Sequence, residues 1–222
     1  MDFSSSTEIL EQLNTIGKLK KWQSLLMGMR EFLEKMRPMI EVYKFIGDGW
    51  IFFVNEETKG DKLVEILRSL HEEYLKLHKR FIADYLSLTI KGHGVSFGVD
   101  HGLVYNTCFK EENNCEYIGR PINVAVRLQS GIGENLQQQT LEYKCMFSKP
   151  AFSEYFGADC PFQNIEVKIK LKNINNDRDS ACVGVSFICK TPPKQDVNQH
   201  LNTILEALRP HIASNTTKQN SR

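Results

Sequence analysis

Apolar residues recur at helical spacing in three stretches of the first half of the chain. The first stretch follows a Ser/Thr-rich turn at residues 2–7, a composition that is typical of a helix start. The second predicts a helix over residues 19–36, which Pro38 ends, and the third predicts a long helix over residues 62–86. Residues 123–129 are also predicted to be helical.

Runs of β-branched and aromatic residues predict the strands. Residues 39–46 and 50–54 flank the sequence Gly47-Asp48-Gly49, which predicts a hairpin with Asp48 at its tip. The same pattern predicts four more strands, at residues 95–99, 103–108, 165–174 and 181–188. Because helices and strands alternate along the chain without an internal repeat, they predict one α+β domain.

The end of the chain differs from the rest. A weakly amphipathic helix is predicted near residues 197–208, and the polar residues 214–222 are predicted to be disordered. We therefore expect one folded domain over residues 1–190, followed by a helix and a disordered tail over residues 191–222.

The charge balance and the cysteine spacing reduce the number of function classes that fit the sequence. Lys plus Arg is 28 and Asp plus Glu is 27, which weighs against binding nucleic acid or an anionic membrane through charge. No apolar run is long enough to span a bilayer, and the sequence shows no signal-peptide pattern. The six cysteines do not have the spacing of a zinc site. We therefore expect reduced thiols and a cytoplasmic protein.

Three polar residues are candidates for chemistry. Asp48 lies in a predicted tight turn, where a carboxylate can bind a hard cation, although an ordinary Asp-Gly hairpin is the commoner explanation. Asn123 and Arg127 lie four positions apart, hence on one face of a predicted helix, and can present donors to a phosphate. By itself this spacing arises often by chance, and a surface capping pair is its commoner explanation. The three residues become informative when they are taken together with Asp2.

Several segments, in the right order over roughly residues 1–190, resemble a known family. A turn that binds metal and phosphate is matched by MDFSSST, and a hairpin that bears a metal carboxylate is matched by YKFIGDGWIFF. The segment EYIGRPINVAVRLQS is similar to one that supplies a base-recognition acid and the Asn and Arg of a transition state. Between them, VSFGVDHGLV resembles a Gly-Ile-His-x-Gly-x-Val strand pair. The family is that of the class III adenylate and guanylate cyclases.

This resemblance implies a ferredoxin-like βαββαβ palm with helices on the sheet. It also implies an enzyme that converts a nucleoside triphosphate into a 3′,5′-cyclic nucleotide and pyrophosphate with two divalent metal ions, Mn²⁺ or Mg²⁺. Asp2 and Asp48 would be the metal carboxylates, with the carbonyl of Phe3 as a further ligand. Arg127 would stabilise the charge that builds on the α-phosphate, and Asn123 would orient the ribose.

The resemblance also implies further substrate contacts. Lys44 and Glu116 would lie in the base pocket. The turn after the first aspartate and one strand lysine would bind the triphosphate, through Ser5, Ser6, Thr7 and Lys172. Lys168 and Lys170 alternate with Lys172 along the same predicted strand, so a solvated strand face is the alternative for this lysine.

A second copy of the chain is the partner that the resemblance implies. In the family, the metal aspartates and the base-pocket residues of one site come from opposite subunits. We therefore expect a head-to-tail homodimer with two equivalent active sites at its interface, and an inactive monomer.

Two departures from the family pattern stand out. Ser5 occupies a turn position that is usually Gly, and we expect the turn to survive this change. Only Met1 precedes Asp2, whereas the family has about half a dozen strand residues there, so the first strand is expected to be missing from this chain. We expect that the reading frame begins upstream and that Met1 is an internal methionine, which the intact mass of the native protein would test.

The base and the biological role rest on finer likeness. Guanylate cyclases tend to place Glu and Cys where this chain has Lys44 and Glu116, so the pair favours a substrate other than GTP. The layout and the turn DxxSST look like the stand-alone bacterial pyrimidine cyclases of the Pycsar antiphage system, which make cyclic UMP or cyclic CMP. The alternatives are an adenylate cyclase that makes cyclic AMP, a catalytically inactive dimerisation or nucleotide-sensing module, and a metal-dependent phosphohydrolase or polymerase-like palm.

Overall fold

The chain divides into two compact units, Met1–Ile188 and Cys189–Arg222. Within the described residues, the helices and strands belong to the first unit, apart from the last residue of its final strand. The helix and the disordered tail that the sequence predicts for residues 191–222 lie outside the described residues. The computed structural model describes residues 1–87, 94–108, 115–136, 142–171 and 180–190.

The first half of the chain follows the predicted pattern closely. The two shorter helices and the hairpin around Asp48 form where the sequence predicts them, while the long helix ends at Phe81 instead of residue 86. The elements are β1 (Asp2–Ser4), α1 (Ser6–Thr15), α2 (Leu19–Lys35), β2 (Ile40–Ile46), β3 (Gly49–Val54), α3 (Gly60–Phe81) and a short 3₁₀ helix, η1 (Ala83–Tyr85).

The second half departs further from the prediction. The sequence missed two strands and a helix, β6, β7 and α5, and placed the strand at 165–174 several residues too late. The helix predicted over residues 123–129 is longer and includes Pro121, because proline is tolerated in a first helical turn. The elements are β4 (Gly94–Val99), β5 (Tyr105–Cys108), β6 (Cys115–Ile118), α4 (Arg120–Leu136), β7 (Tyr143–Ser148), α5 (Lys149–Phe156), β8 (Phe162–Ile169) and β9 (Ser180–Cys189).

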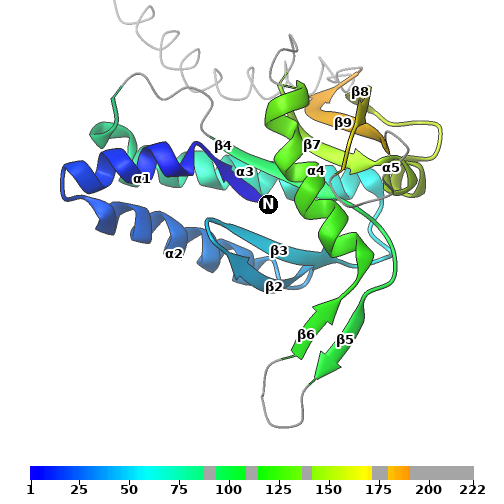
Figure 1. Cartoon of the computed structure of the whole chain (residues 1–222), viewed down its shortest axis with the longest axis horizontal. Helices are drawn as coiled ribbons and strands as arrows, with labels where there is room; N and C mark the ends of the chain where they lie inside the picture. The colour runs from blue at the N-terminus through cyan, green and yellow to red at the C-terminus, as the bar shows by residue number, and fades with distance from the viewer. Residues whose placement is uncertain (88–93, 109–114, 137–141, 172–179, 191–222) are drawn as a thin grey trace, which may run out of the picture. The chain divides into compact units, whose positions relative to one another are not determined.

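Seven strands form one mixed sheet in the order β2-β3-β1-β4-β7-β9-β8. Its first four strands pair antiparallel with one another, while β4 and β7 are parallel, and the four have the order of a ferredoxin-like βαββαβ unit, which confirms the predicted fold class. The first strand corrects the prediction in one respect, because β1 is present as three residues, Asp2–Ser4, between β3 and β4. Among the strands that the structure describes, β5 and β6 pair only with each other and form a separate two-stranded arm (Figure 1).

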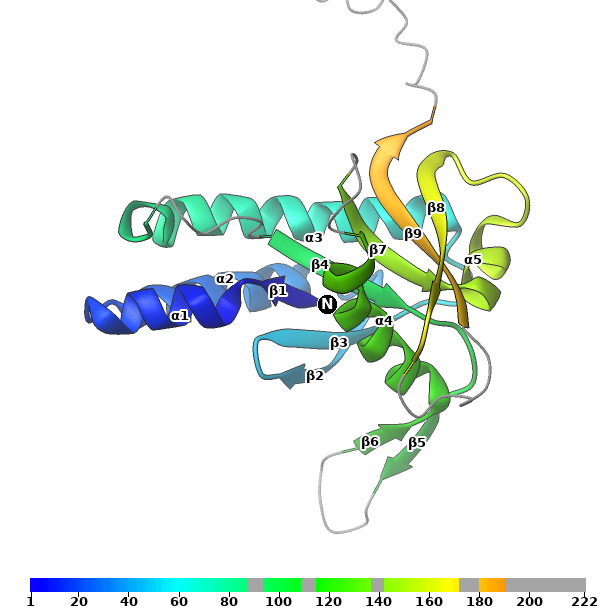
Figure 2. The same ribbon diagram turned by 45° about the horizontal axis from the view of Figure 1, so that its top comes forward.

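The two faces of the sheet are covered by different helices. Helix α4 lies on one face, and α2 and α3 lie on the other (Figures 1 and 2). Phe3 of β1 is buried and its ring contacts Trp22 of α2, Trp50 of β3 and Tyr74 of α3. Because side chains alternate along a strand, the side chain of Asp2 points to the opposite face, where α4 lies.

Helix α4 packs unusually close to β4. A methyl group at Gly98 would overlap the backbone oxygen of Ala125 and would lie 2.6 Å from the backbone nitrogen of Gln129. The missing side chain at Gly98 therefore lets the helix backbone rest directly on the strand. On its buried side the helix contributes to an apolar cluster: Val124, Leu128, Ile132 and Leu136 pack with Met146, Ile169, Leu171 and Cys182.

Among the described residues, no helix is both long enough and apolar enough to cross a membrane.

The contact at Gly98 predicts a large effect of adding a single methyl group. We expect Gly98→Ala to lower the free energy of unfolding by about 3 kcal/mol, because backbone atoms of α4 cannot rotate away as a side chain can. Gly131→Ala, in α4 itself, is the matched control. Its methyl group would meet a flexible Ile169 side chain at 3.3 Å, and alanine has a higher helix propensity than glycine. Equal unfolding midpoints in urea for the two variants would contradict this account.

Candidate active site

The carboxylates of Asp2 and Asp48 meet on the α4 side of the sheet. Asp2 lies in β1 opposite Gly49, and Asp48 is the second residue of the tight turn that joins β2 to β3. Register therefore places the hairpin tip beside the first strand. The two side chains are close enough to interact through their charges and through a hydrogen bond.

This meeting changes the ionisation of Asp2. Burial, the charge of Asp48 and the hydrogen bond between the two carboxyls together raise the pKa of Asp2 from 3.8 to about 6. The N-terminal ammonium and a hydrogen bond from Gln129 act in the opposite direction and are weaker. The two acidic groups are thus held close together, and the N-terminal ammonium and Gln129 offset only part of the cost of ionising Asp2.

The pair suits a divalent cation. Mg²⁺ and Mn²⁺ prefer oxygen ligands and often take only one or two carboxylates from the protein, with substrate phosphates and water in the other positions. Among the described residues no cluster of three or more His, Cys, Asp or Glu side chains gathers, so any further ligands would have to be of other kinds. Because the side chain of Phe3 is in the core, only its backbone carbonyl could contribute.

Gln129 is a site residue that the sequence did not reveal. Its Nε2 donates to Oδ2 of Asp2 at 3.0 Å and to Oγ of Ser96 at 2.9 Å. Gln129 comes from α4, and Ser96 is the β4 residue that pairs with Asp2 in the sheet. Only the seating of α4 on β4 brings these side chains together. In the sequence, this close packing of α4 on β4 is indicated by Gly98, the β4 residue on which the helix rests.

The predicted triphosphate turn joins β1 to α1. Ser5 has a left-handed backbone, with φ 61° and ψ 21°, a conformation that favours glycine and explains why the family usually has Gly at this position. Its carbonyl accepts a hydrogen bond from the nitrogen of Ile9, which starts the helix. Ser6 is buried and Thr7 is exposed. The turn survives the change to serine, as expected.

Lys44 and Glu116, the predicted base-pocket pair, contact each other within one chain. Nζ of Lys44 lies 2.8 Å from Oε1 and 3.1 Å from Oε2 of Glu116. The hydroxyl of Tyr43 also donates to Glu116 and accepts from the backbone nitrogen of Tyr117 at 3.0 Å. Hydrogen bonds from Lys44 and then Tyr43 lower the pKa of Glu116, which keeps it a charged acceptor.

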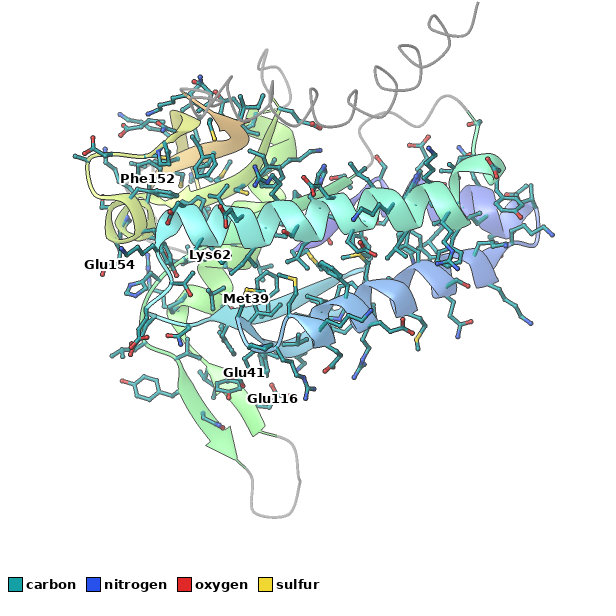
Figure 3. The ribbon with its side chains drawn as sticks, turned by 180° about the vertical axis from the view of Figure 1, so that it is seen from behind. Met39, Glu41, Lys62, Glu116, Phe152 and Glu154 are labelled. Atoms are coloured by element: carbon teal, nitrogen blue, oxygen red, sulfur yellow. The ribbon has the colours of Figure 1, made fainter. Side chains whose placement is uncertain are left out.

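The arm is anchored to β2 by a second, reciprocal contact. The hydroxyl of Tyr117 in β6 donates to Glu41 of β2 at 2.8 Å, and the rings of Tyr43, Phe53 and Tyr117 pack together. Figure 3 shows Glu41 and Glu116 where the arm passes the edge of the sheet. The arm is thus placed by side chains, although its strands do not pair with the main sheet.

Asn123 and Arg127 lie together on α4, Asn123 exposed and Arg127 half-buried. A groove of about 290 Å³ runs between β3, β4 and α4 and is lined by both Asp2 and Gln129. Asn123, Arg127, Lys44 and Glu116 are absent from the described lining of this groove. The described part of one chain therefore does not gather all the predicted site residues in one cavity. Lys172 lies outside the described residues.

Solved structures of other proteins resemble this chain. No protein-family model and no curated protein sequence matches it. The adenylyl cyclase CyaB from P. aeruginosa matches with a TM-score of 0.59 at 18% identity, over 88% of this chain and 92% of that chain. The guanylyl cyclase Cya2 matches with a TM-score of 0.59 at 15% identity, over 87% and 91%. A bacterial light-regulated adenylyl cyclase matches with a TM-score of 0.61 at 17% identity, over 89% of this chain and 54% of its own.

The chain has the class III nucleotidyl cyclase fold. The acidic pair comes from β1 and the β2–β3 turn of the ferredoxin-like unit, whereas Asn123 and Arg127 come from α4 and Glu116 from the arm. Because the sequence identity in these matches is below 20%, they show the fold. The chemistry depends on the side chains of this chain.

The acidic pair predicts a pH dependence of stability for the metal-free protein. Because folding raises the pKa of Asp2 from 3.8 to about 6, the folded state holds more protons than the unfolded state in this window, and stability falls as the pH rises through it. We expect Asp48→Asn to reduce this fall. We also expect Mg²⁺ or Mn²⁺ at pH 7.5 to raise the melting temperature of the wild type but not of Asp48→Asn.

Thermal unfolding with a chelator at several pH values, and then with the metal, measures both effects. Asp84→Asn, a neutralised exposed carboxylate on η1, is the control. The interpretation of the pair is wrong if Asp48→Asn and Asp84→Asn respond alike.

Proposed function

We propose that the chain is the catalytic domain of a class III nucleotidyl cyclase, which converts a nucleoside triphosphate into a 3′,5′-cyclic nucleotide and pyrophosphate. The observation that carries the proposal is the meeting of Asp2 and Asp48 beside α4, on a fold shared with adenylyl and guanylyl cyclases. Paired carboxylates of this kind hold the ions in two-metal phosphoryl transfer.

Asp2 and Asp48, with the backbone carbonyl of Phe3, would hold two divalent ions, Mg²⁺ or Mn²⁺. When bound, these ions would lower the pKa of the ribose 3′-hydroxyl and neutralise the pyrophosphate that leaves. Arg127 would contact the non-bridging oxygens of the α-phosphate, where negative charge builds during the attack. Asn123 would orient the ribose. A guanidinium suits this role because its planar fork can pair two oxygens at once.

The triphosphate would lie over the start of α1. Backbone N–H groups at the beginning of a helix attract anions, and the left-handed Ser5 turns the chain directly from the metal-binding strand into that helix. Ser5, Ser6 and Thr7 would contact the phosphates there. Lys172 would add a positive charge.

A homodimer would complete the site. Asn123 and Arg127 do not share the groove of Asp2 in the described part of one chain, so a head-to-tail partner would supply them. The elements around the groove expose large apolar side chains that a partner could cover: Phe45, Ile46, Leu103, Tyr105, Ile118 and Val126.

The product is proposed to be cyclic UMP or cyclic CMP, a second messenger in antiphage defence. The support is the likeness of the turn Asp2–Thr7 to that of the Pycsar cyclases. The second candidate is an adenylate cyclase, which the pairing of Lys44 with an acid favours. Lys44 offers a donor and Glu116 an acceptor, and every base presents both kinds of group on its Watson–Crick edge, so this pair by itself fits more than one base.

Direct assay decides the base. The protein is incubated with ATP, GTP, CTP and UTP in separate reactions with Mn²⁺, and the products are identified by mass. We expect a cyclic pyrimidine nucleotide and pyrophosphate. Cyclic AMP as the main product would transfer the assignment to the second candidate. Absence of any cyclic product from all four triphosphates would leave the inactive-module alternative.

Mixing two inactive variants tests the shared site. Asp48→Ala removes a metal ligand and Arg127→Ala removes the phosphate contact, and each alone is expected to lose at least about 100-fold in kcat. In an equimolar mixture, half of the dimers are heterodimers, and each heterodimer has one intact site, so about a quarter of wild-type activity should return. No recovery, with dimer formation verified by sedimentation, would place both residues in a site within one chain.

A further inference from the structure

The amide of Gln129 joins three elements at one point. It extends from α4, donates one hydrogen bond to Asp2 of β1 and another to Ser96 of β4. Ser96 is buried, and Asp2 is half-buried. Since Asp2 and Ser96 are paired across the sheet, one amide group bridges two neighbouring strands from above.

The chemistry of these partners fixes the orientation of the amide. An ionised carboxylate can only accept hydrogen bonds, so the nitrogen of Gln129, and not its oxygen, must face Asp2. Its two N–H bonds are then both used, one by the carboxylate and one by the serine hydroxyl. An amide held at both hydrogens cannot rotate without losing a bond to a charged group.

The helix that carries Gln129 is itself firmly placed. The backbone nitrogen of Gln129 would lie 2.6 Å from a methyl group at Gly98, so helix and strand backbones touch at the root of this side chain. Gln129 therefore reaches Asp2 from a rigid position. Rigid support is what a metal-binding carboxylate needs to keep its oxygens in place.

We infer that Gln129 is a positioning residue for Asp2: its amide holds Oδ2 and leaves the other carboxylate oxygen aligned for a divalent cation. Which cation chemistry the site serves rests on the proposed function, but the inference itself concerns metal affinity. A carboxylate ligand in metalloproteins commonly has such an outer partner, and loss of that partner weakens metal binding.

Gln129→Met tests the inference, because methionine has a similar size and cannot donate a hydrogen bond. Mn²⁺ affinity is measured without nucleotide, by the electron paramagnetic resonance signal of the free ion. We expect the Kd of Gln129→Met to rise by about 10-fold to 100-fold. Ser130→Ala, at the next and exposed position of α4, should bind Mn²⁺ like the wild type.

A second variant guards against a folding defect. Gln129→Asn keeps the amide but is one methylene shorter, so it cannot reach both partners and should also bind Mn²⁺ more weakly. The melting temperature of each metal-free variant identifies those that fold. A folded Gln129 variant whose Kd for Mn²⁺ lies within twofold of the wild-type value overturns the inference.

The outcome is separable from that of the proposed function. A wild-type protein that binds Mn²⁺ but makes no cyclic nucleotide would defeat the proposed function, while the comparison of Kd values would still decide the role of Gln129. A wild-type protein that binds no Mn²⁺ would overturn the inference, whatever its activity.

Discussion

The pairing of β1 between β3 and β4 is the constraint on which the candidate site depends. Asp2 lies opposite Gly49 on one side and opposite Ser96 on the other. The first pairing brings the turn that carries Asp48 to its side. Alternation along the same three residues sends Phe3 into the aromatic core below α2 and α3. A slip of one residue would exchange these faces, so the register of the sheet and the chemistry of the site are inseparable.

That register creates an electrostatic cost. Burial and the nearby charge and hydrogen bond of Asp48 raise the pKa of Asp2, so this carboxyl ionises less readily than it would alone. The sheet tolerates the pair because the core on the other face, with Phe3, Trp22 and Tyr74, does not depend on it. A cation between the carboxylates would remove the repulsion, and this stored charge is the physical reason to expect metal binding here.

Local signals in the sequence were sufficient for some features and not for others. The glycines on both sides of Asp48 predict the tight turn there, and the resemblance to the class III cyclases predicts the fold class. Strand β7 escaped because buried Lys144 interrupts its apolar run, and α5 is only eight residues long. The role of Gln129 was not predicted either, because the residues around it do not indicate that α4 packs on β4. Lys44 and Glu116 were named from the resemblance, yet their contact depends on the arm.

Helix α4 connects these observations. It carries Asn123 and Arg127, which the proposed dimer would lend to a neighbouring site, and two residues later Gln129, which holds a carboxylate of its own site. In the same stretch, the helix backbone rests on Gly98 at Ala125 and Gln129. A helix that is fixed on a strand at one point fixes the positions of the side chains on both sides of that point. In such a dimer, the geometry of each acidic pair and the reach of each arginine would therefore be set by the same contact.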